Sequence, residues 1–148
     1  MTNPVYNISN HLIEVLKSGP SLVNTITFEV RDRIDVNKQN IYPLVNIDML
    51  DSTITESLTS ISYLITIVEQ RELGNKLMND KIFGTNYIDN ASECHLIGSR
   101  LIKSFITNRD IFLDNEPVLS FLPNTFDNGL DGVEFNLILS VTNEEDCE

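Results

Sequence analysis

The sequence predicts one α+β domain with a mainly antiparallel sheet and two helices packed on one face. Apolar residues recur at helical spacing in two stretches and alternate with polar residues in several others. A chain of 148 residues with 41% hydrophobic residues has the usual size and enough apolar surface for a single core. We therefore expect one domain over residues 1–142 and a flexible acidic tail at 143–148, where four of six residues are acidic.

The N-terminal third predicts a helix followed by a strand. Apolar residues at Ile8, Leu12 and Leu16 follow helical spacing, and Gly19-Pro20 ends the pattern. Residues 25–30 then alternate as in a half-buried strand, until the polar stretch 31–40 interrupts them.

A long β-hairpin is expected next. Pro43 is tolerated at the start of a strand over 44–50, and residues 58–68 are rich in β-branched side chains. The connection 51–57 is too short for a crossover helix, so the two strands must pair antiparallel.

Residues 69–89 form a long polar excursion that we interpret as an arm, since loops in compact domains are usually shorter. Exposed apolar residues in an arm favour contact with a neighbouring subunit; the alternative is a short helix folded back on the core. The residues expected at a subunit interface are Arg71, Leu73, Lys76, Leu77, Met78, Ile82 and Phe83.

The C-terminal half predicts a helix, an edge strand and a long strand. Asn90 and Glu93 resemble a capping pair that opens a helix to Ile106, and Gly98 on its apolar stripe indicates close approach to the sheet. Residues 117–122 suit a short edge strand. In 132–142 apolar and polar residues alternate clearly, after turns at Asn128-Gly129 and Asp131-Gly132.

Composition narrows the classes of function. A net charge of −12 opposes non-specific binding to nucleic acid or anionic membranes. Two cysteines cannot build a disulfide framework, and no stretch resembles a signal peptide or a membrane span, so we expect a reducing compartment and no membrane.

The sequence offers no catalytic constellation. His11 and His95 are the only histidines, and no nucleotide-binding or hydrolase motif surrounds them. Residues 127–138 resemble a calcium loop, but Ile138 stands where a bidentate glutamate is required. We expect no enzyme activity, no cofactor and no metal.

The order of elements resembles that of the tail-terminator and tail-completion proteins of tailed bacteriophages. The resemblance spans most of the chain and is carried by the N-terminal helix, the phrase YPLVNID at 42–48, the β-rich run 60–68, the helix 90–106 and the final strand GVEFNLILSV. The arm and the acidic tail have no counterpart in it.

The resemblance implies a homo-oligomeric ring at the head-to-tail junction of the virion. Such a ring is assembled in the host cytoplasm, stops tail-tube growth, joins the tube to connector and other tail proteins, and lets DNA pass without specific binding. The family has no catalytic residues to carry over. Two alternatives remain open: a cytoplasmic adaptor that binds one protein partner, and a small enzyme with a pocket between helix and sheet.

Overall fold

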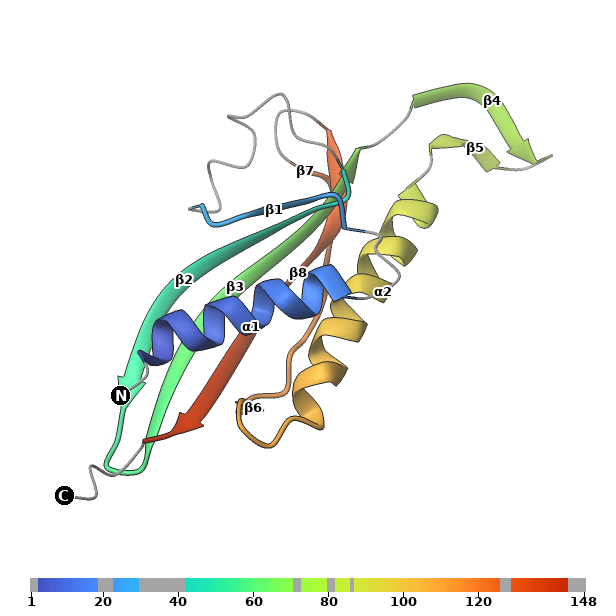
Figure 1. The fold of residues 1–148 in the computed structure, drawn as a ribbon. Coiled ribbons are helices and arrows are strands. Elements are labelled where there is room, and N and C mark those ends of the chain that lie inside the picture. Colours follow the sequence, from blue (N-terminus) through green and yellow to red (C-terminus); the bar gives the residue numbers. More distant parts are fainter. Residues whose placement is uncertain are drawn as a thin grey trace.

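In the computed structural model, the chain forms a six-stranded mixed sheet with two helices on one face (Figure 1). The structure describes residues 3–18, 23–29, 42–70, 73–79, 82–85, 87–125 and 129–143, with backbone alone at 73–79, 82–85, 124 and 125. The elements are α1 (Pro4–Ser18), β1 (Thr25–Thr27), β2 (Leu44–Ile54), β3 (Leu58–Gln70), β4 (Leu73–Asn79), β5 (Ile82–Thr85), α2 (Tyr87–Ile106), β6 (Phe112–Leu113), β7 (Ser120–Thr125) and β8 (Leu130–Thr142).

The main sheet has the order β1-β2-β3-β8-β6, and β7 also pairs with β8. Every pair in it is antiparallel except β1 with β2, which is parallel. The predicted hairpin is confirmed as β2 and β3, and it is longer than expected because only Thr55, Glu56 and Ser57 separate the strands. Strand β8 pairs with β3 along its whole length, from Leu58↔Thr142 to Gln70↔Leu130.

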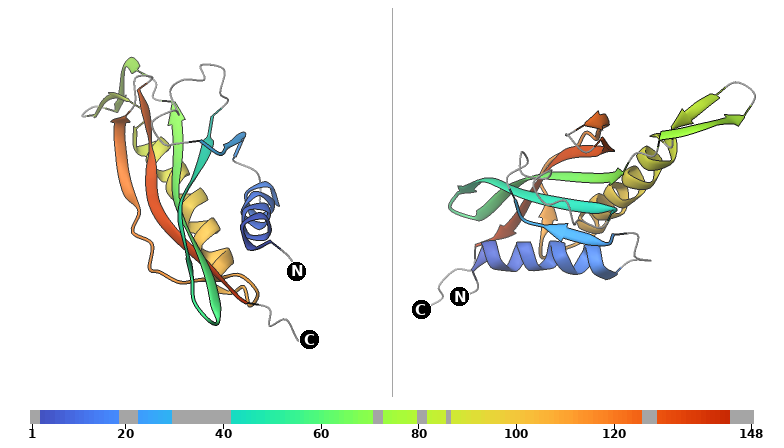
Figure 2. Two further views of the ribbon diagram at one scale, coloured as in Figure 1. Left: turned by 90° about the vertical axis from the view of Figure 1, so that its left-hand side faces the viewer. Right: turned by 90° about the horizontal axis from the view of Figure 1, so that it is seen from above.

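Both helices cover the same face of the sheet, as the α+β prediction required (Figure 2). The periodic apolar residues of each helix point into one core together with alternate residues of β2, β3 and β8. The fully buried core side chains include Ile8, Leu12, Tyr63, Ile65, Leu101, Phe105, Leu137 and Leu139. Tyr63 places its hydroxyl 3.0 Å from Ser9 Oγ, which ties α1 to β3.

Gly98 lies where α2 comes closest to the sheet, as the sequence predicted. A Cβ atom at this position would lie 3.1 Å from the Phe135 ring and 3.3 Å from Leu119 Cδ2. Both contacts are tighter than ordinary van der Waals packing, so the absent side chain sets the distance between helix and sheet.

The predicted helix start at Asn90 was wrong, because α2 begins at Tyr87. Asn90 lies inside the first turn and is buried. Its amide donates to Gln70 O at 3.1 Å and to Asp131 Oδ2 at 3.2 Å, so its side chain binds the strands of the sheet and caps no helix.

The two predicted turn glycines have different roles. Gly129 has φ = 66°, the left-handed conformation expected of a turn glycine. Gly132 instead lies within β8, opposite Val68. A Cβ atom there would lie 1.8 Å from Ile67 O, so glycine is required by the closeness of the β3 backbone.

The edge strand predicted at 117–122 begins three residues later, at Ser120, and contains Pro123. A proline is tolerated in β7 because β8 is its only strand partner in the described chain, so one side of its backbone needs no ladder hydrogen bond. Strand β6 was not predicted, since two residues carry no periodicity.

The sheet face away from the helices is mostly polar. Buried Asn46 accepts from Thr27 Oγ1 at 2.7 Å and from Glu29 N at 3.1 Å, and donates to Glu29 O at 3.0 Å. This side chain fastens the chain after β1 to β2. Thr66 donates to Glu134 Oε2 on the same face at 2.9 Å.

Within the 69–89 arm, residues 73–79 and 82–85 pair as a β-hairpin, while 69–70 belong to β3 and 87–89 to α2, which corrects both the loop and the short-helix alternatives. Strands β4 and β5 form a separate two-stranded sheet that projects from the body next to the start of α2 (Figures 1 and 2). At the other end of the chain, Asn143 does not belong to a flexible tail. It binds the β2–β3 turn through Ser57 O and Thr55 O, while residues 144–148 lie outside the described residues.

Candidate functional site

The projecting hairpin carries most of the residues predicted for a subunit interface. Its backbone register sets Leu73 opposite Thr85 and Leu77 opposite Phe83. The structure thus gathers onto one ribbon six of the seven predicted residues: Leu73, Lys76, Leu77, Met78, Ile82 and Phe83. The seventh, Arg71, lies outside the described residues.

The base of the hairpin is fixed by the buried amide of Asn90. Gln70 is the last residue of β3 and Asn90 lies in the first turn of α2, so the bond between them joins the two ends of the arm. The same amide reaches Asp131 on β8. These two bonds hold the end of β3 and the start of α2, and therefore the two ends of the arm, close together.

Cys94 lies beside this junction and is chemically inert. Its thiol is buried and approaches Asp131 O at 3.9 Å. Burial, together with the nearby carboxylates of Glu69, Glu93 and Asp131, raises the pKa of the Cys94 thiol to about 12. The thiolate that a nucleophile or a metal ligand requires is therefore almost absent at neutral pH.

An apolar pocket of about 440 Å³ lies between the first half of α2 and β7. The His95 ring stacks on Phe121, with centroids 6.1 Å apart and an angle of 17° between planes. Ile88 is 71% exposed and Phe121 53% exposed, so the pocket offers apolar surface to a partner. Its lining residues are Tyr87, Ile88, Ala91, Ser92, His95 and Phe121.

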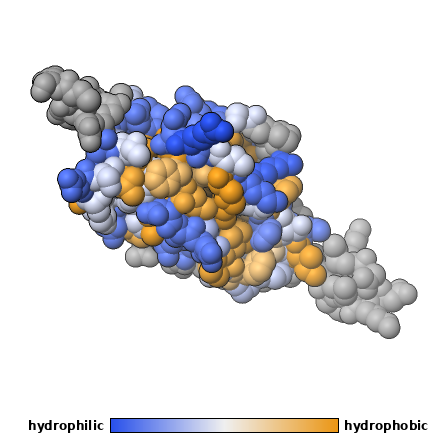
Figure 3. All heavy atoms as spheres, turned by 90° about the horizontal axis from the view of Figure 1, so that it is seen from below, coloured by the Kyte–Doolittle hydropathy of each residue, from blue (hydrophilic) through white to orange (hydrophobic). Residues whose placement is uncertain are grey.

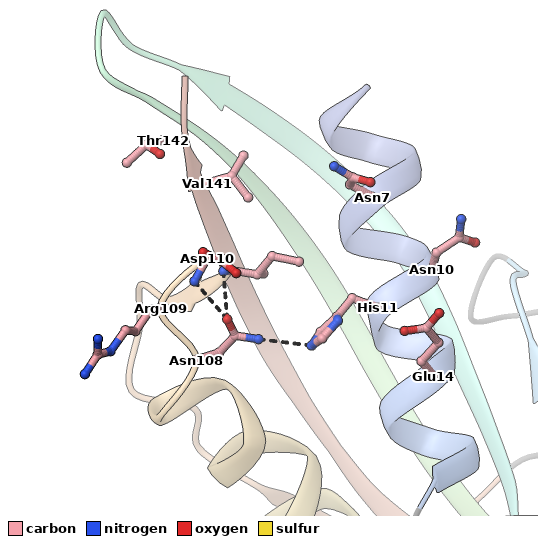
Figure 4. A pocket seen from close by; sticks show the side chains of 10 residues that line it. Asn7, Asn10, His11, Glu14, Asn108, Arg109, Asp110, Val141 and Thr142 are labelled. Atoms are coloured by element: carbon pink, nitrogen blue, oxygen red, sulfur yellow. Dashed lines mark hydrogen bonds between the residues drawn. The ribbon is translucent and has the colours of Figure 1, made fainter. Parts of the chain in front are cut away.

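A larger polar pocket, about 570 Å³, lies between α1, the α2–β6 loop and the end of β8 (Figure 4). Asn108 organises its floor. The Asn108 Oδ1 atom accepts from Asp110 N at 2.9 Å and from Ile111 N at 3.1 Å, which assigns the other amide atom as the donor. That Nδ2 atom lies 3.0 Å from His11 Nε2.

His11 is therefore committed to a structural bond. Since Asn108 Nδ2 donates, His11 Nε2 accepts and carries no hydrogen, which assigns the Nδ1–H form to the neutral ring. The ring also packs edge-on against Phe105, with centroids 5.5 Å apart. These contacts fasten α1 to the loop after α2.

Glu14 and Asp110 also line the pocket, yet no group of three metal-binding side chains occurs among the described residues.

Strand β2 has an outer edge that sequence reasoning missed. We use "outer edge" for residues 49–54 on the side away from β3, because β1 pairs only with residues 44–46. No strand of the described chain pairs along this edge. Met49 and Leu50 are each 49% exposed and Ile54 is 75% exposed, and a register shift interrupts the strand between Met49 and Asp51.

Apolar side chains also gather in the middle of the face seen from below, bordered by hydrophilic ones (Figure 3). At this lower end of the molecule, Ile106 is exposed at the end of α2 and Ile54 at the end of β2. The apolar surface is thus divided among several sites: the α2–β7 pocket, the outer edge of β2 and the lower end of the body.

Neither helix of the described chain is long and apolar enough to cross a membrane. A comparison with known protein families found no match, and a comparison with curated protein sequences found none either.

Proposed function

We propose that the chain is a structural virion protein that forms a homo-oligomeric ring at the head-to-tail junction of a tailed bacteriophage. In this role it joins the tail tube to the portal or connector and lets DNA pass. The projecting β4–β5 hairpin is the single observation that carries the proposal. A two-stranded hairpin is marginally stable in water by itself, so a contact with a neighbouring subunit would stabilise it.

The distribution of charge supports the same role. The chain holds 22 acidic and ten basic residues, and a ring with this excess would repel the DNA that passes through it. Residues 71–85 do not share this acidic excess, since they contain three basic and two acidic residues. An arm with this composition suits contact with an acidic body of its own kind.

The proposal is tested by removing the arm while keeping the body. The ends of the arm lie close together, because Asn90 Nδ2 is 3.1 Å from Gln70 O. Residues 72–85 are replaced by a short Gly-Ser linker, and both proteins are added to purified tail tubes and viewed by electron microscopy. We expect wild-type rings that cap the tube ends and uncapped tubes with the variant.

Unchanged circular dichroism of the variant serves as the folding control. Tube ends that stay bare with the wild-type protein at high concentration contradict a terminator or connector role. Equal capping by both proteins would show that capping does not need the hairpin, which contradicts the role proposed for it.

A non-enzymatic adaptor is the second candidate, and the α2–β7 pocket favours it. The pocket exposes Ile88 and Phe121 beside the base of the hairpin, as a site for an apolar peptide segment would. An adaptor would stay monomeric and bind apolar peptides in solution, and Phe121→Ala would weaken that binding. Titration by fluorescence anisotropy with a panel of apolar peptides separates this role from ring assembly.

A further inference from the structure

We propose that the β4–β5 hairpin of one copy adds to the outer edge of β2 in the next copy, which would close the ring through an intersubunit β-sheet. The inference rests on the proposed function, and it names the surface that receives the hairpin. It depends on three properties of the described chain: an unpaired strand edge, complementary composition, and the positions of the two surfaces.

The outer edge of β2 offers backbone groups for pairing. Beyond residue 46, β2 has β3 as its only strand partner in the described chain. Residues 49–54 would span about 20 Å in extended form, and β4, with seven residues, is long enough to follow them. An edge of this kind presents N–H and C=O groups that an added strand satisfies.

The composition of the edge selects its partner. The outer edge carries Asp51 and no basic residue, and the register shift near Leu50 interrupts regular pairing. Charges and bulges of this kind protect sheet edges from indiscriminate association. A cationic strand with apolar neighbours overcomes that protection, and β4 supplies Lys76 next to Leu77 and Met78.

The exposed apolar side chains on the edge strengthen the match. Met49, Leu50 and Ile54 lie along β2 with much of their surface in water. The hairpin contributes four apolar residues of its own: Leu73, Leu77, Ile82 and Phe83. Cross-strand apolar pairs and opposite charges each stabilise an added strand.

The two surfaces lie at opposite ends of the molecule. The hairpin projects from the end where α2 begins, whereas β2 runs away from it toward the β2–β3 turn (Figure 1). One copy therefore cannot fill its own edge. Because donor and acceptor are different surfaces, their pairing is head-to-tail and builds a ring or a filament. The α2–β7 pocket lies beside the hairpin base, so mutual exchange there would give a two-fold dimer.

A charge exchange between two variants tests the pairing. The acceptor variant is Asp51→Lys/Thr53→Lys, and both positions are exposed on β2. The donor variant is Lys76→Glu on β4. Each variant alone sets like charges against each other, and we expect about a 100-fold weaker association. In an equimolar mixture every contact joins opposite charges, and rings should form again with the two variants alternating.

The matched control is Thr107→Lys/Glu116→Lys, which changes the net charge by the same +3 at exposed positions away from β2. Mass photometry measures the masses of the oligomers present, and amide hydrogen exchange identifies the residues at the contact between subunits. Assembly should slow exchange at 49–54 and in the hairpin, with little change at 44–46, which β1 already covers.

The outcomes separate the inference from the proposed function. If the wild-type protein forms rings but the mixture of variants stays dissociated, the pairing of hairpin and β2 edge is wrong and the proposed ring is unaffected. A wild-type dimer without larger species assigns the hairpin to the α2–β7 pocket and also overturns the inference. A wild-type protein that stays monomeric at high concentration and leaves tube ends bare overturns both. Recovery in the mixture shows in addition that both variants are folded.

Discussion

Replacing Gly132 with alanine should break the pairing between β3 and β8 near the start of β8. The new Cβ atom would lie 1.8 Å from Ile67 O, 2.9 Å from its carbonyl carbon and 3.0 Å from Val68 Cα. A carbon and an oxygen in contact normally stay about 3.3 Å apart. Strands β3 and β8 must therefore separate locally by more than about 1 Å. Ladder hydrogen bonds of about 2.9 Å between donor and acceptor atoms would break at that separation.

The magnitude follows from the bonds that are lost. Two ladder hydrogen bonds flanking the site would break, and each leaves buried donors and acceptors unsatisfied at about 1–3 kcal/mol. We expect Gly132→Ala to lower the free energy of unfolding by about 3–5 kcal/mol, a large part of the about 5–15 kcal/mol typical of a domain.

Urea denaturation followed by circular dichroism measures this difference, with two glycines as internal comparisons. Gly129→Ala places a side chain at φ = 66° and should cost about 1–2 kcal/mol. Gly98→Ala should change the free energy of unfolding less than Gly132→Ala does, because a gain in helix propensity of about 1 kcal/mol offsets the cost of its tight contacts with side chains. A Gly132→Ala variant as stable as Gly129→Ala would refute the close approach of β3 to β8.

Four further predictions concern buried polar groups of the body. Tyr63→Phe removes the 3.0 Å bond to Ser9 and should cost about 1 kcal/mol, with a double-mutant cycle to Ser9→Ala recovering most of that loss as coupling. Asn90→Ala removes the bonds to Gln70 O and to Asp131 Oδ2 and should lower the free energy of unfolding in urea by about 1–3 kcal/mol; a loss below about 0.5 kcal/mol contradicts the role of Asn90 in joining the ends of the arm. In a Cys147→Ser background, Cys94 should resist a thiol reagent at pH 8 until the protein unfolds, because burial raises its pKa to about 12. That thiol keeps its proton in the folded state while the unfolded state loses it, so stability should fall as pH rises from about 9 toward 12. Cys94→Ala should reduce this slope and leave the part that buried Tyr63 contributes through its own raised pKa.

Elements with strong local periodicity were predictable from the sequence. The stripe of α1, the β2–β3 hairpin and the alternation of β8 each come from residues close together in the chain, and the structure confirms them. The parallel pairing of β1 was not predictable, because it depends on contacts with Asn46 far along the chain. The start of α2 was misplaced for the same reason: Asn90 looks like a cap locally and binds two strands in space.

The candidate interface was predictable in its chemistry and not in its arrangement. The apolar and cationic residues of the arm stand out in the sequence, but their placement on a hairpin depends on a turn and a register that no periodic pattern announces. The outer edge of β2 could not be predicted from the sequence, because β2 is left without a partner on this side only beyond the point where β1 ends, at Thr27. The polar pocket likewise joins His11 to Asn108, which are 97 residues apart.

The central claim is that the chain assembles with its own kind through the projecting hairpin. Native mass spectrometry of the wild-type protein and of the variant without residues 72–85 tests it most directly. We predict a closed oligomer of one defined size for the wild type and a folded monomer for the variant. A wild-type spectrum with monomer alone, or the same oligomer from both proteins, would contradict the account.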